Sequence, residues 1–121
     1  MRAFPYVPYS QVFPRAAAVV HQAGIGTLAQ ALRAGRPQLI VPVAFDQPDN
    51  ARRAQALGVA RVLPFRKANA RRLAAELGAL FANPGYAGAA RSVAETLQPV
   101  DGAARAAEEL IACAAAACRI G

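Results

Sequence analysis

The chain has 121 residues, a formal net charge of +7 and a hydrophobic fraction of 55%. This length fits a single domain with a modest core, because alanine dominates the hydrophobic residues and tryptophan is absent. The apolar runs are far too short to cross a membrane, and no signal-peptide pattern opens the chain. We therefore expect a cytoplasmic protein without a transmembrane segment.

The positive charge comes from basic residues spread along the chain, with small clusters at Arg52-Arg53, Arg66-Lys67 and Arg71-Arg72. No aromatic residues interleave with them in the stacking pattern of a nucleic-acid surface. We interpret them as solvated helix faces, with attraction for a diphosphate or an acidic surface as the alternative, and expect no nucleic-acid partner. The two cysteines, at positions 113 and 118, lack metal-ligand spacing and are expected to be buried or half-buried free thiols.

The predicted elements alternate between strands and helices. Residues 2–7 resemble a short strand, and prolines at positions 5, 8 and 14 make the next segment a loop with at most one helical turn. Apolar runs predict further strands, and the helical period predicts the helices. The expected strands are residues 2–7, 16–20, 38–43 and 59–63, and the expected helices are residues 25–34 and 49–57 and three more in series after Asn69, the last with a stripe from Val100 to Cys118.

This alternation predicts an α/β fold, with a partial Rossmann-like parallel sheet of about four strands flanked by helices. A complete nucleotide domain of this type has five or six strands and binds its ligand outside their carboxyl ends. Residues 1–121 are therefore expected to form one domain that corresponds to the second half of such a unit and is apparently truncated.

The first candidate site is the sequence His-Gln-Ala-Gly-Ile-Gly-Thr, which joins a strand to a helix. Gly24 and Gly26 supply the freedom for positive φ that lets backbone N–H groups approach a phosphate, and the helix dipole favours its negative charge. Thr27 can cap the helix or donate its hydroxyl, and His21 can donate to a phosphate oxygen. The competing interpretation is that His21 is purely structural.

The second candidate site is the pair Asp46-Gln47, which follows the most apolar strand. A carboxylate and an amide side by side can accept from and donate to adjacent sugar hydroxyls. The alternative is that Asp46 or Asp49 only caps the following helix, a contribution of about 1 kcal/mol.

Taken in order, these motifs resemble the C-terminal half of bacterial family 1 glycosyltransferases of the GT-B fold, the UDP-glucuronosyl/glucosyltransferase-like type. The matching features are His-x-x-Gly-x-Gly-Thr, Ala-Gly-x-Pro, an apolar strand and Asp-Gln-x-x-Asn-Ala, and the likeness runs from about residue 4 to 65 and more loosely to 112. The resemblance implies a donor diphosphate site at His21, Gly24, Gly26 and Thr27, a ribose site at Gln30 and a donor-sugar site at Asp46 and Gln47.

Two positions depart from the family pattern. Ala23 stands where glycine is usual, and Gln30 stands where many members have a glutamate that binds ribose hydroxyls. The implied activity is the inverting transfer of a hexose from a UDP- or dTDP-sugar to a hydroxyl acceptor, with no metal or other cofactor. The family carries its general base on a preceding acceptor domain, so we expect this chain to have no catalytic residue of its own and negligible turnover in isolation.

Three alternatives remain open at this point. The chain could be the donor subunit of a two-component N-acetylglucosamine transferase, whose acceptor half is a separate subunit. It could also be a non-catalytic module that binds nucleotide sugars or self-associates. An NAD-dependent enzyme is disfavoured, because no third glycine follows Gly24 and Gly26 at the spacing of the dinucleotide fingerprint.

We further expect a homo-oligomer. A sheet without its opening strands exposes an edge, and bare edges and apolar faces favour pairing with another copy. The alanine-rich stripe of the last helix offers a second packing surface.

Overall fold

The structure is a computed structural model that describes residues 1–118. Its order of elements is the alternation expected from the sequence. A short helix α1 and a 3₁₀ turn precede the first strand, and three longer helices follow the last one. The elements are α1 (Tyr9–Val12), η1 (Phe13–Arg15), β1 (Val19–His21), α2 (Ile25–Arg33), β2 (Gln38–Ile40), α3 (Gln47–Ala56), β3 (Ala60–Val62), η2 (Phe65–Lys67), α4 (Ala70–Ala82), α5 (Pro84–Leu97) and α6 (Gly102–Cys118).

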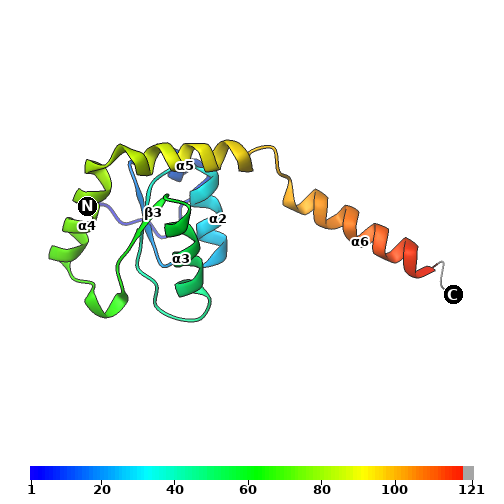
Figure 1. The fold of residues 1–121 in the computed structure, drawn as a ribbon, viewed down its shortest axis with the longest axis horizontal. Coiled ribbons are helices and arrows are strands. Elements are labelled where there is room, and N and C mark those ends of the chain that lie inside the picture. Colours follow the sequence, from blue (N-terminus) through cyan, green and yellow to red (C-terminus); the bar gives the residue numbers. More distant parts are fainter. Residues whose placement is uncertain (119–121) are drawn as a thin grey trace.

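The three strands form one parallel sheet in the order β1-β2-β3. Val19 lies opposite Gln38 and His21 opposite Ile40, and β3 pairs with the other side of β2. All three residues of β2 are buried, as expected for the central strand of a covered parallel sheet. In Figure 1 the sheet lies between α4 on one side and α2 and α3 on the other, and α5 runs across one end.

The main core lies between this sheet and the helices α2, α3 and α5. Its buried members are small or medium-sized: Ala23, Leu28, Ile40, Ala51, Ala54, Val59, Ala60 and Ala90. A second, smaller cluster joins Phe13 and Val19 to Ala31 of α2. More than half of these buried side chains are alanines, so the core is built from small side chains.

The expected strand at residues 2–7 does not form, so the sheet has three strands and not about four. Residues 1–6 are exposed. Pro5 and Pro8 have no amide hydrogen to donate to a neighbouring strand, which accounts for the difference. As a result, β1 is an edge strand, and its Val20 side chain is about half exposed.

The remaining elements agree with the prediction, with shorter strands. The strand expected at 38–43 ends at Ile40 because pairing stops before Pro42, although Val41 still donates to the carbonyl of His21 at 2.9 Å. The helices α2 and α3 end before Gly35 and Gly58, both with positive φ, as a C-terminal glycine allows. Asn69 caps α4 by accepting from the amide of Arg72 at 2.9 Å, as the sequence predicted.

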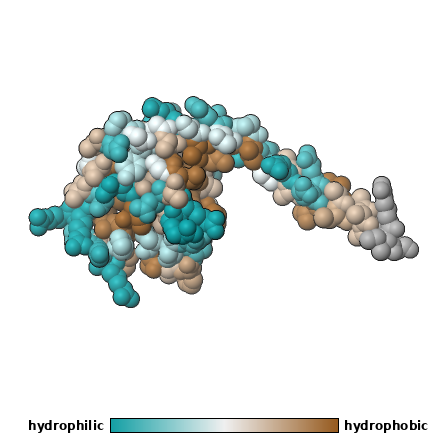
Figure 2. Space-filling view, in the orientation of Figure 1, coloured by the Kyte–Doolittle hydropathy of each residue, from teal (hydrophilic) through white to brown (hydrophobic). Residues whose placement is uncertain are grey.

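The last helix, α6, projects from the body of the domain (Figure 1). Residues 101–117 are all exposed, including Leu110 and Ile111, and Figure 2 shows hydrophobic surface along this helix. Cys113 is an exposed free thiol, so the expected burial is wrong for this residue, because α6 has no neighbouring element to cover it. The side chain of Cys118 lies outside the described residues. Within residues 1–118, no helix combines the length and the apolar character that a membrane crossing needs.

Candidate functional site

The two loops predicted to carry chemistry lie at the same edge of the sheet. β1 ends at His21 and is followed by the turn into α2, and β2 ends at Ile40 and is followed by the loop into α3. The two strands are parallel neighbours, so their carboxyl ends meet. This is the edge at which open parallel sheets bind their ligands.

The turn after β1 depends on Ala23, not on the glycines. Ala23 has φ 70°, whereas Gly24 has φ −59° and Gly26 lies inside α2. The prediction that the two glycines supply positive φ is therefore wrong, because the helix begins at Ile25 and only Ala23 makes the left-handed step. A left-handed alanine costs about 1–2 kcal/mol. This residue is also completely buried, so its surroundings must hold it in place.

The turn presents the amino end of α2, a helix of nine residues. The first intrahelical bond runs from the amide of Leu28 to the carbonyl of Gly24 at 2.9 Å. The amides of Ile25, Gly26 and Thr27 therefore have no partner within the helix. Thr27 is the third residue of the helix and Gly24 is its N-cap, so Thr27 does not cap it and its half-buried hydroxyl makes no hydrogen bond to the described residues.

His21 is buried at the end of β1, and both of its ring nitrogens are engaged. Nε2 lies 2.8 Å from Oε1 of Gln38, and Nδ1 accepts from the amide of Ala23 at 3.0 Å. Burial lowers the pKa of His21 below its ordinary value, partly offset by the hydrogen bond to Gln38. The expected hydrogen bond from His21 to a phosphate is therefore not available in this geometry, because the ring has no free N–H.

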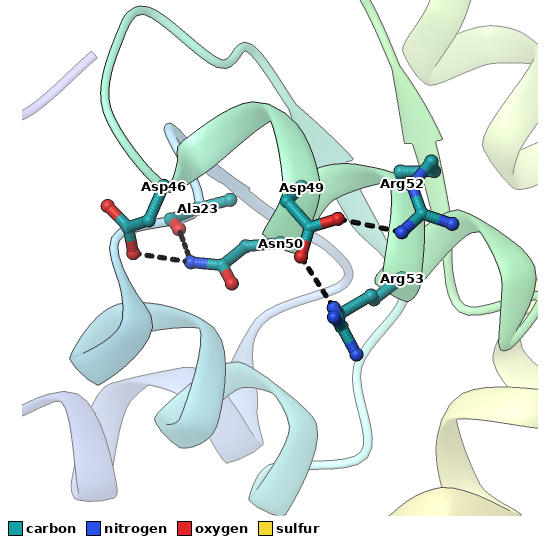
Figure 3. A network of polar contacts seen from close by, with 6 residues as sticks. All are labelled: Ala23, Asp46, Asp49, Asn50, Arg52 and Arg53. Carbon is teal, nitrogen blue, oxygen red and sulfur yellow. Dashed lines mark hydrogen bonds and ion pairs between the residues drawn. The ribbon is translucent and has the colours of Figure 1, made fainter.

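One side chain, Asn50, joins the two loops (Figure 3). Its Nδ2 donates to the carbonyl of Ala23 at 3.0 Å and to Oδ2 of Asp46 at 2.7 Å. Asp46 is the residue before α3 but makes no capping hydrogen bond with its side chain, so the capping interpretation of Asp46 is wrong. Its other carboxylate oxygen makes no hydrogen bond to the residues that the structure describes.

Gln47 closes the loop that precedes it. Its Oε1 accepts from the amides of Val43 and Ala44 at 2.9 and 3.2 Å, which identifies the oxygen of the amide. The Nε2 group is left as a donor beside the carboxylate of Asp46. Asp46 and Gln47 thus place a carboxylate and a side-chain amide at the start of α3, and their role as a sugar site stays a prediction.

Asp49 has a different role from Asp46. It accepts from Arg53 and Arg52 at 2.6 and 2.7 Å on the exposed side of α3 (Figure 3). The hydrogen bonds from these two arginines lower the pKa of the Asp49 carboxyl. Asp49 is therefore occupied within its own helix and gives a matched control for Asp46.

Gln30 lies on the exposed side of α2. It lines a hollow of about 510 Å³ together with residues 4–10, which include Tyr6 and Tyr9. Tyr9 stacks on Phe13, with ring centroids 4.5 Å apart. The N-terminal segment, which does not form the expected strand, therefore lines one side of this hollow. The side-chain amide of Gln30 lines the other side.

The loop after β2 also carries a strained aromatic residue. Phe45, immediately before Asp46, has φ 58° and is 95% exposed. A bulky residue in this conformation is uncommon and carries backbone strain. Other residues of this loop help to form a mainly apolar hollow of about 520 Å³, which is lined by Pro42, Val43, Pro48, Val62, Pro64, Phe65, Arg66 and Lys67.

Comparison with known proteins gives this geometry a family. Residues 1–112 match the model of the "Erythromycin biosynthesis protein CIII-like, C-terminal domain". The chain belongs to this family. It is 43% identical over 94 residues to O-mycaminosyltylonolide 6-deoxyallosyltransferase of Streptomyces fradiae, which is 77% of this chain and 22% of that enzyme. It is 38% identical over 111 residues to the elloramycin glycosyltransferase ElmGT of Streptomyces olivaceus, which is 87% of this chain and 27% of that enzyme.

Solved structures show the same fold. The glycosyltransferase VinC in complex with dTDP superimposes with a TM-score of 0.82 at 33% identity, over 91% of this chain and 28% of that one. The spinosyn rhamnosyltransferase SpnG complexed with thymidine diphosphate superimposes with a TM-score of 0.70 at 28% identity, over 77% of this chain and 26% of that one. The predicted resemblance to the C-terminal half of GT-B glycosyltransferases is confirmed, and the chain spans about a quarter of the length of these relatives.

Proposed function

We propose that this chain is the donor-binding part of an inverting glycosyltransferase that moves a hexose from a dTDP- or UDP-sugar to a hydroxyl acceptor. The observation that carries the proposal is the contact of Asn50 with both Ala23 and Asp46, which makes one site from the two predicted loops. Two structural relatives are complexes with thymidine diphosphate, which favours dTDP as the nucleotide.

The diphosphate belongs at the amino end of α2. The amides of Ile25, Gly26 and Thr27 lack intrahelical partners, and the helix dipole adds partial positive charge there. When the bond to the sugar breaks, negative charge grows on the diphosphate, and donors already aimed at it stabilise the transition state. Gly24 is the N-cap and lets the ligand approach the backbone, while His21 acts through the turn that it holds.

The sugar belongs beside Asp46 and Gln47. The free oxygen of Asp46 accepts from one hydroxyl, and Nε2 of Gln47 donates to a neighbouring one. These contacts orient the ring so that its anomeric carbon faces the acceptor. The ribose belongs near Gln30, whose amide lines the hollow formed with residues 4–10.

The acceptor side requires a general base. The chain has one histidine, and both nitrogens of that ring are already hydrogen-bonded. Since the chain spans about a quarter of the length of its relatives, we propose that another domain or a separate subunit supplies the base and the acceptor pocket. The same division of labour fits a two-component transferase. A cytoplasmic location stays a prediction.

Calorimetric titrations with dTDP and with dTDP-glucose test the proposal. Asp46→Ala should weaken binding of the nucleotide sugar by about tenfold and leave binding of dTDP within about twofold, because only the sugar reaches this residue. Asp49→Ala is the matched control, since that carboxylate is held by Arg52 and Arg53. Equal losses for both ligands in Asp46→Ala, or no binding of either ligand to the wild type, would contradict the assignment.

A further inference from the structure

His21 and Gln38 form a buried pair beneath the diphosphate turn. Gln38 is completely buried in β2, and His21 is 8% exposed at the end of β1. The register places Gln38 opposite Val19, so Gln38 and His21 occupy diagonal positions on one face of the sheet. Their polar atoms meet at 2.8 Å.

Two contacts together, one at each ring nitrogen, select which nitrogen of His21 carries the proton. The amide of Ala23 can only donate, so Nδ1 of His21 must be a bare acceptor. A neutral ring then has its proton on Nε2, which needs an acceptor of its own. Within residues 1–118, Oε1 of Gln38 is the acceptor that Nε2 contacts.

We propose that Gln38 is a positioning residue of the donor site: by accepting the Nε2 proton, it fixes the His21 tautomer that holds Ala23 in its left-handed turn. That turn sets where the free amides of Ile25 and Gly26 lie. The inference rests on the proposed function for the identity of the ligand, whereas the tautomer is a property of the free protein.

The other end of the Gln38 amide supports this role. Its Nε2 is buried and has no hydrogen-bond partner among the described residues. A buried amide group left unpaired is destabilising, and methionine would fill a similar volume without that cost. Packing of β2 therefore does not explain why a polar side chain stands at this position. The need for an acceptor for the Nε2 proton of His21 does explain it.

The turn is held from both sides. The amide of Ala23 donates to His21, and its carbonyl accepts from Asn50, which also contacts Asp46. Loss of the first contact leaves the carbonyl contact with Asn50 as the remaining side-chain hydrogen bond to the strained residue. We therefore expect a change at Gln38 to alter diphosphate binding without any direct contact between this side chain and the ligand.

Nitrogen NMR tests the tautomer directly, because the chain has a single histidine and needs no assignment among several. In the wild type we expect the proton on Nε2 and a bare Nδ1. In Gln38→Met the acceptor is lost, and the proton should move to Nδ1 in part or completely. The buried neighbour Leu39, replaced by Met, is the matched control and should keep the wild-type tautomer.

Binding of thymidine diphosphate is the second readout. Gln38→Met should weaken it by about tenfold, whereas Leu39→Met should leave it within about twofold. Gln38→Glu keeps an acceptor oxygen but draws a second proton onto the ring, which would place an Nδ1–H against the amide of Ala23. We expect this variant to bind weakly as well, with the signals of a charged ring at a pH where the wild type is neutral.

A wild-type ring protonated on Nδ1 would overturn the proposal even if Gln38→Met failed to fold. An unchanged tautomer and unchanged affinity in a folded Gln38→Met would also overturn it. If the tautomers behave as expected but no form of the chain binds the nucleotide, the proposed function fails while the link from Gln38 through His21 to Ala23 stands.

Discussion

The contact between the two loops can be broken by a substitution that hardly changes side-chain size. Asn50→Asp removes the two N–H donors that reach Ala23 and Asp46. It also places a carboxylate against two oxygens, one of them the charged Oδ2 of Asp46. The variant therefore replaces two hydrogen bonds by two electrostatic repulsions at the point where the two loops meet.

The loss of folding free energy in Asn50→Asp can be estimated from these contacts. Each lost hydrogen bond contributes about 1 kcal/mol net, and two unit charges about 4 Å apart repel by about 1 kcal/mol in water. The water value applies because Asp46 is exposed and Asn50 is half-buried. Relaxation of the exposed loop offsets part of this total, so we expect Asn50→Asp to lower the free energy of unfolding by about 2 kcal/mol at pH 7. Asn50→Ala should cost about 1 kcal/mol, because it adds no charge and favours the helix.

Urea unfolding followed by circular dichroism measures both variants, at a protein concentration low enough to avoid association. Repulsion raises the pKa of the paired carboxyls in folded Asn50→Asp, so the destabilisation should be full above that pKa and shrink as the pH falls through it. Asp49→Asn, on the exposed face of the same helix, should leave the transition midpoint unchanged. Equal stability of wild type and Asn50→Asp, or a larger loss in Asn50→Ala, would refute the bridging role of Asn50.

Four further outcomes are expected. Because burial lowers the pKa of His21, the free energy of unfolding should fall as the pH drops below about 6.5, where the unfolded chain takes up the proton first, and His21→Gln should lack this dependence in the same urea assay. Phe45→Gly should raise the melting temperature slightly, since relief of about 1–2 kcal/mol of left-handed strain exceeds the added flexibility of the unfolded chain, and the exposed ring loses no packing. Light scattering should give a mass above 12.6 kDa that rises with concentration, and Val20→Lys on the open edge of β1 should reduce it; a constant 12.6 kDa would exclude association. The purified chain should not transfer a hexose from dTDP-glucose to a simple alcohol, and robust turnover would show that a base is present on this chain.

Much of the fold follows from local patterns. Residues 38–40 of the expected apolar strand are buried, as a central parallel strand must be, and Gly35 and Gly58 end their helices as expected. The strand expected at residues 2–7 does not form, because a short segment with apolar residues does not by itself show that a strand has a partner. Pro5 and Pro8 argue against a strand, because neither has an amide hydrogen to donate to a neighbouring strand.

The sequence predicts the two loops of the site but not the side-chain contacts that join them. The motif identified Asp46 and Gln47, yet nothing local shows that Asn50 reaches back to the carbonyl of Ala23. The left-handed turn was assigned to the glycines because they adopt positive φ most easily, whereas the start of α2 at Ile25 forces the step onto Ala23. The only indication of the buried pair of His21 and Gln38 in the sequence is that a glutamine begins an otherwise apolar strand.

The central claim is that one ligand site spans the two loops at the carboxyl edge of the sheet. Backbone amide NMR of the labelled chain during titration with thymidine diphosphate tests it most directly, because each residue reports separately. We predict saturable shifts concentrated at residues 21–27, with further shifts at residues 43–50 when dTDP-glucose replaces the nucleotide. Absence of shifts at millimolar ligand, or shifts confined to the hollow that Arg36 and Arg91 line away from these loops, would contradict the account.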